Sequence, residues 1–351
     1  MATLPTIETD KRIPTLDGWR ALAVFMVLLS HFQPGYLGHA IWGAQWFNLG
    51  QHGVQIFFVL SGYLITANLL REEEIKLGRF YVRRFFRLMP AAWSYLIFLG
   101  LLSVLTNIKA IGSDAWSCLF FFRNYVPETH ANTCTEHFWS LSLEEQFYLA
   151  WPPILALLGR RRAAFTAALA AIGLAVYTRA VWSGSHDFFL FQHTEIRADG
   201  LLVGCVLAFV LQDQSVRQWL MRHGRTVFWV CLIPLGWDLY RYQIDGLMTL
   251  HESILIAIVI ACTSLHPAAL PGRLLELPFI RITGIMSYSI YLWQGLFFRA
   301  SWGIFGPLLF AGAFLLSWRF IEQPGIRFGR KLLSRYSKRS IPPESAVVVA
   351  G

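Results

Sequence analysis

Arg20 and His31 are the first residues of the chain whose types and spacing point to chemistry. They lie eleven residues apart in the apolar run DGWRALAVFMVLLSHF. A helix turns about 100° per residue, so both side chains fall on one stripe, separated by roughly 16 Å of rise. An arginine inside a membrane span costs at least about 2.5 kcal/mol, so the pair is by default a functional site facing a bundle interior. A neutral, hydrogen-bonded His31 with a structural role is the alternative.

A second candidate site is the basic segment FYVRRFFRLMP at 80–90, which supplies Arg83, Arg84 and Arg87. Arg84 and Arg87 are three residues apart and share a helix face. Planar guanidinium groups bind phosphates in bidentate fashion, so the pair suits a polyanionic cytoplasmic ligand. Basic residues beside a span also set topology and bind anionic lipid headgroups, which is the competing interpretation.

Two carboxylates follow in HFWSLSLEEQFYLAWP at 137–152, which we expect at the outer end of a span. Glu144 and Glu145 lie about 100° apart on a helix, so at most one faces the same wall of a cavity as its neighbours. Ser142 with Glu145 also fits a capping box, which is a structural role.

Further polar residues enter the later spans. Arg197 and Asp199 in EIRADGLLVG are hypothesised to pair with the two glutamates, and such a pair lowers the cost of burial even if it is purely structural. Tyr291 and Gln294 in SYSIYLWQ place polar groups near the end of the chain. Glu322 in WRFIEQP is interpreted as marking the inner interface.

The composition predicts an all-α integral membrane protein. Of 351 residues, 55% are hydrophobic and 15% charged, against about 25% charged in soluble domains. About ten apolar windows have the length of a span, which are 16–33, 52–70, 90–106, 139–158, 163–182, 197–212, 226–242, 249–265, 282–300 and 303–321.

The basic residues predict the orientation of these spans. Placing the N-terminus inside puts 22 of the 30 Lys and Arg residues in inner segments, and the first outer loop, 34–51, has none. Both termini are therefore predicted to be cytoplasmic. The net charge of +9 follows from this pattern and does not indicate a nucleic-acid partner.

The chain is predicted to form one membrane domain over 1–325 and a basic, disordered cytoplasmic tail over 326–351. Loops 107–138 and 183–196 are expected at the outer mouth, where they would select an acceptor. Gly53, Ser61 and Gly62 are expected to allow close packing against the first span.

The five cysteines lack CxxC spacing, which argues against a metal site. Cys118 and Cys134 share one predicted outer region, so a disulfide between them is a hypothesis.

The chain resembles the membrane acyltransferase family 3, the O-antigen acetylase type, over nearly all of residues 12–325. The motifs that carry the resemblance, in family order, are R-x10-H as Arg20 and His31, R-x-x-R as Arg84 and Arg87, GVQIFFVLSGYLIT, WSLSLEEQFYLAWP and SYSIYLW.

The resemblance implies transfer of an acyl group, usually acetyl, from cytoplasmic acyl-coenzyme A to a hydroxyl of a carbohydrate or glycoconjugate, in the bacterial cytoplasmic membrane. It also implies that His31 is catalytic and that Arg84 and Arg87 serve the acyl donor. Many relatives have His where Gln294 stands, so no proton-transfer role is assigned to Gln294.

The residues agree with this function. Phosphates of coenzyme A suit the arginines, and neutral His31 would deprotonate the acceptor hydroxyl or form an acyl-histidine intermediate. The predicted catalytic residues are His31, Arg20, Glu144 and Glu145; donor binding falls to Arg83, Arg84 and Arg87, and substrate binding to Arg197, Asp199, Tyr291 and Gln294. The partners expected are acetyl-coenzyme A or another acyl-coenzyme A, a carbohydrate acceptor and membrane lipids. A transporter of an anionic or sugar solute is the rival interpretation, because buried Arg, His and Glu also line substrate paths.

Overall fold

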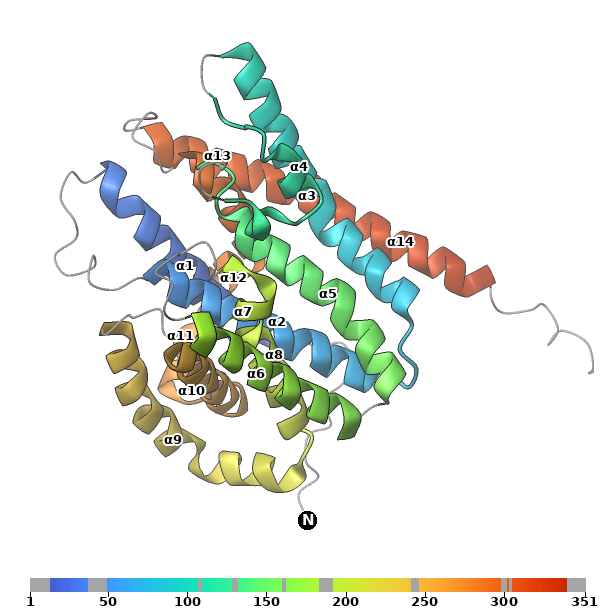
Figure 1. Ribbon diagram of the computed structural model, residues 1–351, viewed down its shortest axis with the longest axis vertical. Coiled ribbons are helices and arrows are strands. Elements are labelled where there is room, and N and C mark those ends of the chain that lie inside the picture. The colour runs from blue at the N-terminus through green and yellow to red at the C-terminus, as the bar shows by residue number, and fades with distance from the viewer. Residues whose placement is uncertain are drawn as a thin grey trace, which may run out of the picture.

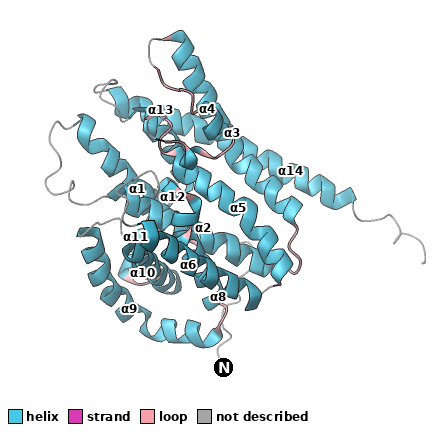
Figure 2. Ribbon diagram, viewed as in Figure 1, coloured by secondary structure: helices cyan, strands magenta, loops and turns pink. Residues whose placement is uncertain are grey.

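Every regular element in the described part of the chain is a helix, as Figure 1 and Figure 2 show. The computed structural model describes residues 13–36, 49–106, 109–127, 132–159, 162–182, 192–240, 246–297, 302 and 305–339. The all-α prediction is confirmed for these residues.

The first helices along the chain are α1 (Pro14–Tyr36), α2 (Leu49–Arg71), α3 (Leu77–Leu105), α4 (Ala115–Leu119), the 3₁₀ turn η2 (Arg123–Tyr125), α5 (Phe138–Leu158) and α6 (Arg162–Trp182). They are followed by α7 (Thr194–Arg197), α8 (Asp199–Val210), α9 (Gln214–Tyr240), α10 (Gly246–Leu265), α11 (Leu270–Leu275), α12 (Pro278–Phe297), α13 (Gly306–Ser317), the π-helical turn η6 (Trp318–Glu322) and α14 (Gln323–Arg339).

Each of the ten predicted windows overlaps at least one helix, yet the helices differ in length and in how apolar they are. Among the described residues, α2 and α3 are long and apolar enough to cross a membrane. The pair α8 and α9, which bends by 102°, adds a third candidate. A span needs about 20 residues, and α8 and α13 have 12 each. The count of ten spans therefore stays a prediction.

Helix α2 is the centre of the fold, and small residues bring its neighbours close. The Gly53 Cα faces α1, where an added β-carbon would stand 2.5 Å from the Ala23 carbonyl oxygen. Gly62 faces α8 instead, since its β-carbon would stand 1.8 Å from the Leu201 carbonyl oxygen. The predicted packing against α1 is thus confirmed for Gly53, whereas Gly62 serves the contact with α8.

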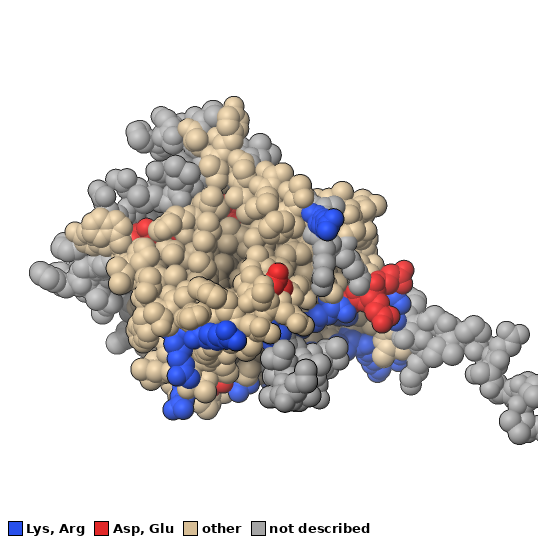
Figure 3. All heavy atoms as spheres, turned by 90° about the horizontal axis from the view of Figure 1, so that it is seen from below, with Lys and Arg blue, Asp and Glu red and all other residues tan. Residues whose placement is uncertain are grey.

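The outer surface of the molecule is largely apolar. Val104, Leu157 and Ile233 are 82%, 85% and 76% exposed, on α3, α5 and α9. Figure 3 shows most of the charged residues of one face gathered in a band along its lower edge, with only a few scattered over the remainder of that face. Extended apolar patches of this kind are unusual on soluble monomers and suit contact with lipid.

The predicted disordered tail begins too early in the sequence. Residues 326–339 belong to α14, which lies beside α3 in Figure 1. Phe328 packs on Phe86 with ring centroids 5.0 Å apart, and Gly325 approaches the Phe86 carbonyl. Apolar residues at helical spacing within a basic segment give α14 one face to bury. Residues 340–351 lie outside the described residues.

Candidate active site

Arg84 of α3 forms an ion-pair cluster with both glutamates of α5. Its Nη2 lies 2.7 Å from Glu145 Oε1 and 3.4 Å from Glu144 Oε1, and its Nε donates to Glu145 Oε1 at 3.2 Å. The guanidinium carbon also stands 3.2 Å from the centroid of the Tyr148 ring, which is a cation–π contact. Two carboxylates and an aromatic face therefore hold Arg84 within the protein.

Glu144 is fixed by two further hydroxyl donors. Ser61 of α2 donates to Glu144 Oε1 at 2.6 Å, and Tyr148 donates to the same oxygen at 2.8 Å. The cluster thus ties α2, α3 and α5 together. Because charge-assisted hydrogen bonds are the stronger class, this network makes the glutamates a rigid frame for Arg84.

Arg87 differs from Arg84 in having no such frame. Within the described residues it forms no hydrogen bond or ion pair, and it is exposed. Its electrostatic neighbours are Arg20 of α1, Arg84 and Glu322. Arg20 is partly held by Asp17, whose Oδ1 lies 3.3 Å from Arg20 Nη1. Three guanidinium groups therefore meet here, and Arg87 is the one available to an anion.

Glu322 belongs to this cluster and not simply to a membrane interface. It is 3% exposed and accepts a hydrogen bond from Ser289 of α12 at 2.7 Å. It sits at the end of η6, the π-helical turn, and such turns are frequent at functional sites.

Two sequence interpretations of this region, which concern Glu145 and Arg83, do not match the structure. Glu145 does not form a capping box with Ser142, because α5 already begins at Phe138 and Ser142 Oγ accepts from the Arg123 backbone N–H. Arg83 points away from the cluster, is half exposed and pairs with Glu72 at 2.9 Å.

Helix α1 carries Arg20 and His31 on one continuous helix, as the spacing predicts. The Nδ1 of His31 lies 2.8 Å from the Val27 carbonyl oxygen, which can only accept a hydrogen bond. In the neutral ring, Nδ1 therefore carries the proton and Nε2 has the free lone pair. The side chain is exposed, so this lone pair is accessible to a reactant.

A buried polar group that sequence reasoning missed lies near His31. His137, directly before α5, is 5% exposed and is an electrostatic neighbour of His31. Tyr291 donates to the His137 carbonyl at 3.3 Å and shares a 2.5 Å hydrogen bond with Ser140. Gln294 is fully buried. The sequence signal for His137 is a histidine two residues before the start of the WSLSLEEQ motif.

Arg197 and Asp199 do not pair with the glutamates. Both are buried, and Arg197 Nη2 reaches Gln51 Oε1 of α2 at 3.5 Å. The expected pairing fails because α3 begins at Leu77, thirteen residues before the predicted span. The first turns of α3 therefore lie beside α5, and Arg84 forms ion pairs with both carboxylates.

A second buried acid–base pair lies nearby and was also missed. His52 Nδ1 stands 2.6 Å from Glu252 Oε1, joining α2 to α10, and both side chains are buried. Gln55 donates to Ser253 one turn further along. No group of three or more potential metal ligands exists among the described residues.

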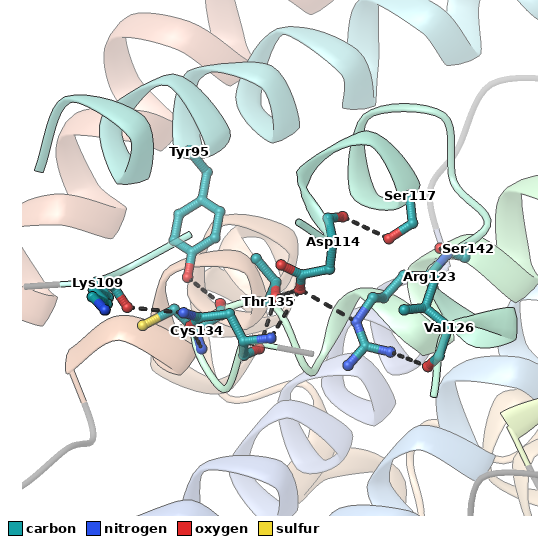
Figure 4. Close-up of polar contacts among 10 residues, drawn as sticks. Tyr95, Lys109, Asp114, Ser117, Arg123, Val126, Cys134, Thr135 and Ser142 are labelled. Carbon is teal, nitrogen blue, oxygen red and sulfur yellow. Dashed lines mark hydrogen bonds and ion pairs between the residues drawn. The ribbon is translucent and has the colours of Figure 1, made fainter. Parts of the chain in front are cut away.

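The segment between α3 and α5 folds as a cap around a buried ion pair (Figure 4). Arg123 Nε lies 3.6 Å from Asp114 Oδ2, which also accepts from Thr135 and from the Asn132 backbone N–H. Tyr125 of the cap donates to Glu195 of α7 at 2.7 Å. The two loops expected at the outer mouth, 107–138 and 183–196, therefore meet.

The cap contains the two cysteines of the disulfide hypothesis. Cys118 and Cys134 are both buried, and neither is in a disulfide. The predicted disulfide is therefore absent, and the ion pair and hydrogen bonds around Asp114 hold the cap in its place.

In the part of the chain that the structure describes, the all-helical architecture, the apolar outer surface and the internal cluster of charged side chains are features of an integral membrane protein with a polar interior site. The sequence pattern of the acyltransferase domain family, Acyl_transf_3, matches residues 13–321. The chain therefore belongs to this family, as its motifs suggest.

Curated relatives agree with the family. The peptidoglycan O-acetyltransferase OatA of Listeria monocytogenes is 32% identical over 82% of this chain and 50% of its own length. The putative peptidoglycan O-acetyltransferase YrhL of Bacillus subtilis is 32% identical over 82% of this chain and 49% of its own. A putative O-acetyltransferase of Staphylococcus aureus strain COL is 30% identical over 92% and 58%. The chain thus spans about half the length of these relatives. No solved structure matches it.

Proposed function

We propose that the chain is an integral membrane O-acyltransferase that moves an acyl group, acetyl in the first instance, from acyl-coenzyme A to a hydroxyl of a carbohydrate or glycoconjugate. The observation that carries this proposal is the course of α1, which contributes Arg20 to the arginine cluster and carries the exposed His31 about three turns further along. An anion site and a base are thereby joined by one rigid helix. The relatives named O-acetyltransferases support the same chemistry.

The arginines divide the binding of the donor. Arg87, with Arg20 beside it, binds phosphates of coenzyme A, while Arg84 and its glutamates hold the helices that position it. The pantetheine arm then follows α1 toward His31. Arg197, Asp199 and Tyr291 line the acceptor side of the interior.

His31 acts as the general base. Its Nε2 removes the proton of the acceptor hydroxyl while that oxygen bonds to the acyl carbon, the carbon–sulfur bond breaks, and the proton passes to the departing thiolate. A positioned base of this kind contributes about 10²- to 10⁴-fold to the rate. An acyl-histidine intermediate is the two-step version of the same transfer.

The proposed topology has ten spans, both termini in the cytoplasm and the enzyme in the bacterial cytoplasmic membrane. It is supported by the overlap of each apolar window with a helix and by the exposed apolar side chains of α3, α5 and α9. The donor cluster then faces the cytoplasmic half and the cap faces outward.

The test is release of free coenzyme A from acetyl-coenzyme A by the protein in lipid nanodiscs, with extracted cell-surface glycans as acceptors. Wild type and the control His266→Ala are expected to release thiol only when glycan is added, and His31→Ala is expected to release none while retaining its thermal unfolding temperature. Thiol release by His31→Ala at the wild-type rate contradicts the proposal. If wild type releases no thiol either with or without glycan, and proteoliposomes containing it take up a sugar or an anion, the protein is a transporter instead.

A further inference from the structure

His137 is a buried histidine whose ring nitrogens are not used by the fold. It is 5% exposed, and neither Nδ1 nor Nε2 has hydrogen-bond geometry with a described residue, although the Leu292 backbone interacts electrostatically with the ring. A β-carbon on Gly295 of α12 would stand 2.6 Å from Nδ1. A glycine is therefore required for the imidazole to occupy this position.

The frame around His137 fixes the ring although it leaves the nitrogens free. The rings of Tyr95 and Tyr291 each stand edge-on with centroids 5.6 Å from that of the imidazole. The Ser140 and Tyr291 hydroxyls lie 3.2 and 3.3 Å from the His137 carbonyl oxygen, so one of them donates to it while the other donates to its neighbouring hydroxyl. Packing and backbone bonds thus preorganise a polar side chain that has no structural hydrogen bond of its own.

Gln294, one residue before Gly295, is a second buried polar side chain without a hydrogen-bond partner among the described residues. Its side chain is fully buried, and neither Nε2 nor Oε1 has a hydrogen-bond partner among the described residues. Buried polar groups are hydrogen-bonded in the great majority of cases. Two neighbouring exceptions, from α12 and from the start of α5, indicate a ligand that supplies hydrogen-bonding atoms.

The chemistry of these side chains specifies what they recognise. Burial disfavours the charged imidazolium, so His137 enters as a neutral ring with one N–H donor. The Gln294 amide adds two N–H donors. His31, the proposed base, is an electrostatic neighbour of His137. Buried N–H donors close in the fold to a base suit an oxygen that gains negative charge during reaction.

We propose that His137 and Gln294 donate hydrogen bonds to the carbonyl oxygen of the acyl group as it becomes an oxyanion. This inference rests on the proposed acyl transfer. When the acceptor oxygen bonds to the acyl carbon, the carbonyl electron pair moves to oxygen, where the two side chains bind it. The pair returns as the carbon–sulfur bond breaks, and the acceptor proton passes through His31 to the thiolate.

The test compares His137→Leu and Gln294→Leu, which remove the donors, with His137→Gln and Gln294→Asn, which keep an N–H donor. Each leucine variant is expected to lower kcat by about 10²- to 10³-fold, the usual effect of losing one such donor, with the KM for acetyl-coenzyme A unchanged within about twofold. The donor-retaining variants are expected to recover part of kcat. His266→Leu, whose Nε2 meets the Leu220 carbonyl at 3.1 Å, is the matched control.

Gln294→Leu separates catalysis from folding. It replaces an unpaired buried amide by an apolar side chain of similar size, so its unfolding temperature is expected to equal or exceed that of wild type while kcat falls. Full kcat in both leucine variants overturns the inference. It is also overturned if the affinity for acetyl-coenzyme A falls by the same factor as kcat. If His31→Ala is inactive in the same assay, only this inference has failed; if His31→Ala is fully active, the proposed function has failed.

Discussion

Arg84 Nη2 lies 2.7 Å from Glu145 Oε1, so the guanidinium that the R-x-x-R spacing offers to a donor is already committed to a carboxylate of α5. Arg87, one turn further along α3, forms no such pair within the described residues. The two arginines of the R-x-x-R motif therefore have different roles. Arg84 joins helices, and Arg87 is free to bind an anion.

Arg84→Lys is expected to lower both stability and transfer. Lysine cannot reproduce the bonds to Glu145 or the stacking on Tyr148, and it leaves partly buried carboxylates with fewer hydrogen-bond donors. Complete loss of one partner of a buried pair costs about 3–5 kcal/mol, and this variant should cost less because lysine keeps the charge and Arg84 is 18% exposed. Unfolding in detergent measures it. The exposed Arg79→Lys on the same helix is the control, and equal stability of the two variants contradicts the assignment.

Arg87→Gln is expected to weaken donor binding without destabilising the protein. A hydrogen bond to a charged group contributes about 1.5–3 kcal/mol, so the Kd for coenzyme A should rise roughly 10- to 100-fold. Isothermal titration with coenzyme A measures this change, and the unfolding temperature should remain that of wild type. An unchanged Kd would remove Arg87 from the donor site.

Gly62→Ala is expected to destabilise the contact between α2 and α8. The added methyl would stand 1.8 Å from the Leu201 carbonyl oxygen, so backbone must move, and overpacking of this kind costs about 1–3 kcal/mol. Gly100→Ala on α3 meets nothing within 4 Å and should instead add about 0.5–1 kcal/mol of stability. Free energies of unfolding test the pair. The packing account is wrong if both substitutions shift stability in the same direction.

Cys118 is expected to resist alkylation in the folded protein. Burial, with a contribution from Asp114, raises the pKa of this thiol to about 12, and only the thiolate is nucleophilic. At pH 8 the thiolate fraction is about 10⁻⁴, and it should rise tenfold per pH unit up to that pKa. Peptide mapping after N-ethylmaleimide treatment should find Cys118 unmodified natively and modified in detergent-denatured protein. Rapid native labelling, or a disulfide with Cys134, would contradict the cap described here.

Local spacing predicted much of this molecule. The helical identity of the apolar windows, the stripe that joins Arg20 to His31, and the close approach at Gly53 all follow from periodicity and residue size. The start of α3 could not be predicted in this way, because its first turns are basic and were expected to form a loop. In the structure these turns are helical and pack against α5 and α14.

The ion pairs between residues far apart in the sequence could not be predicted from local spacing. Glu144 and Glu145 were assigned to Arg197 because both pairs were expected at the outer ends of spans, whereas the longer α3 brings Arg84 to them. His137 and the His52–Glu252 pair carried no periodic signal at all. Such groups become visible only when burial is known.

The central claim is that His31 transfers an acyl group to a carbohydrate. Proteoliposomes containing wild type or His31→Ala are supplied with acetyl-coenzyme A labelled in the acetyl group on the donor side and with peptidoglycan fragments on the other, and the label in recovered glycan is counted. We predict label in glycan with wild type, released as acetate by mild base, and none with His31→Ala despite intact folding. Equal labelling by both proteins would contradict the account.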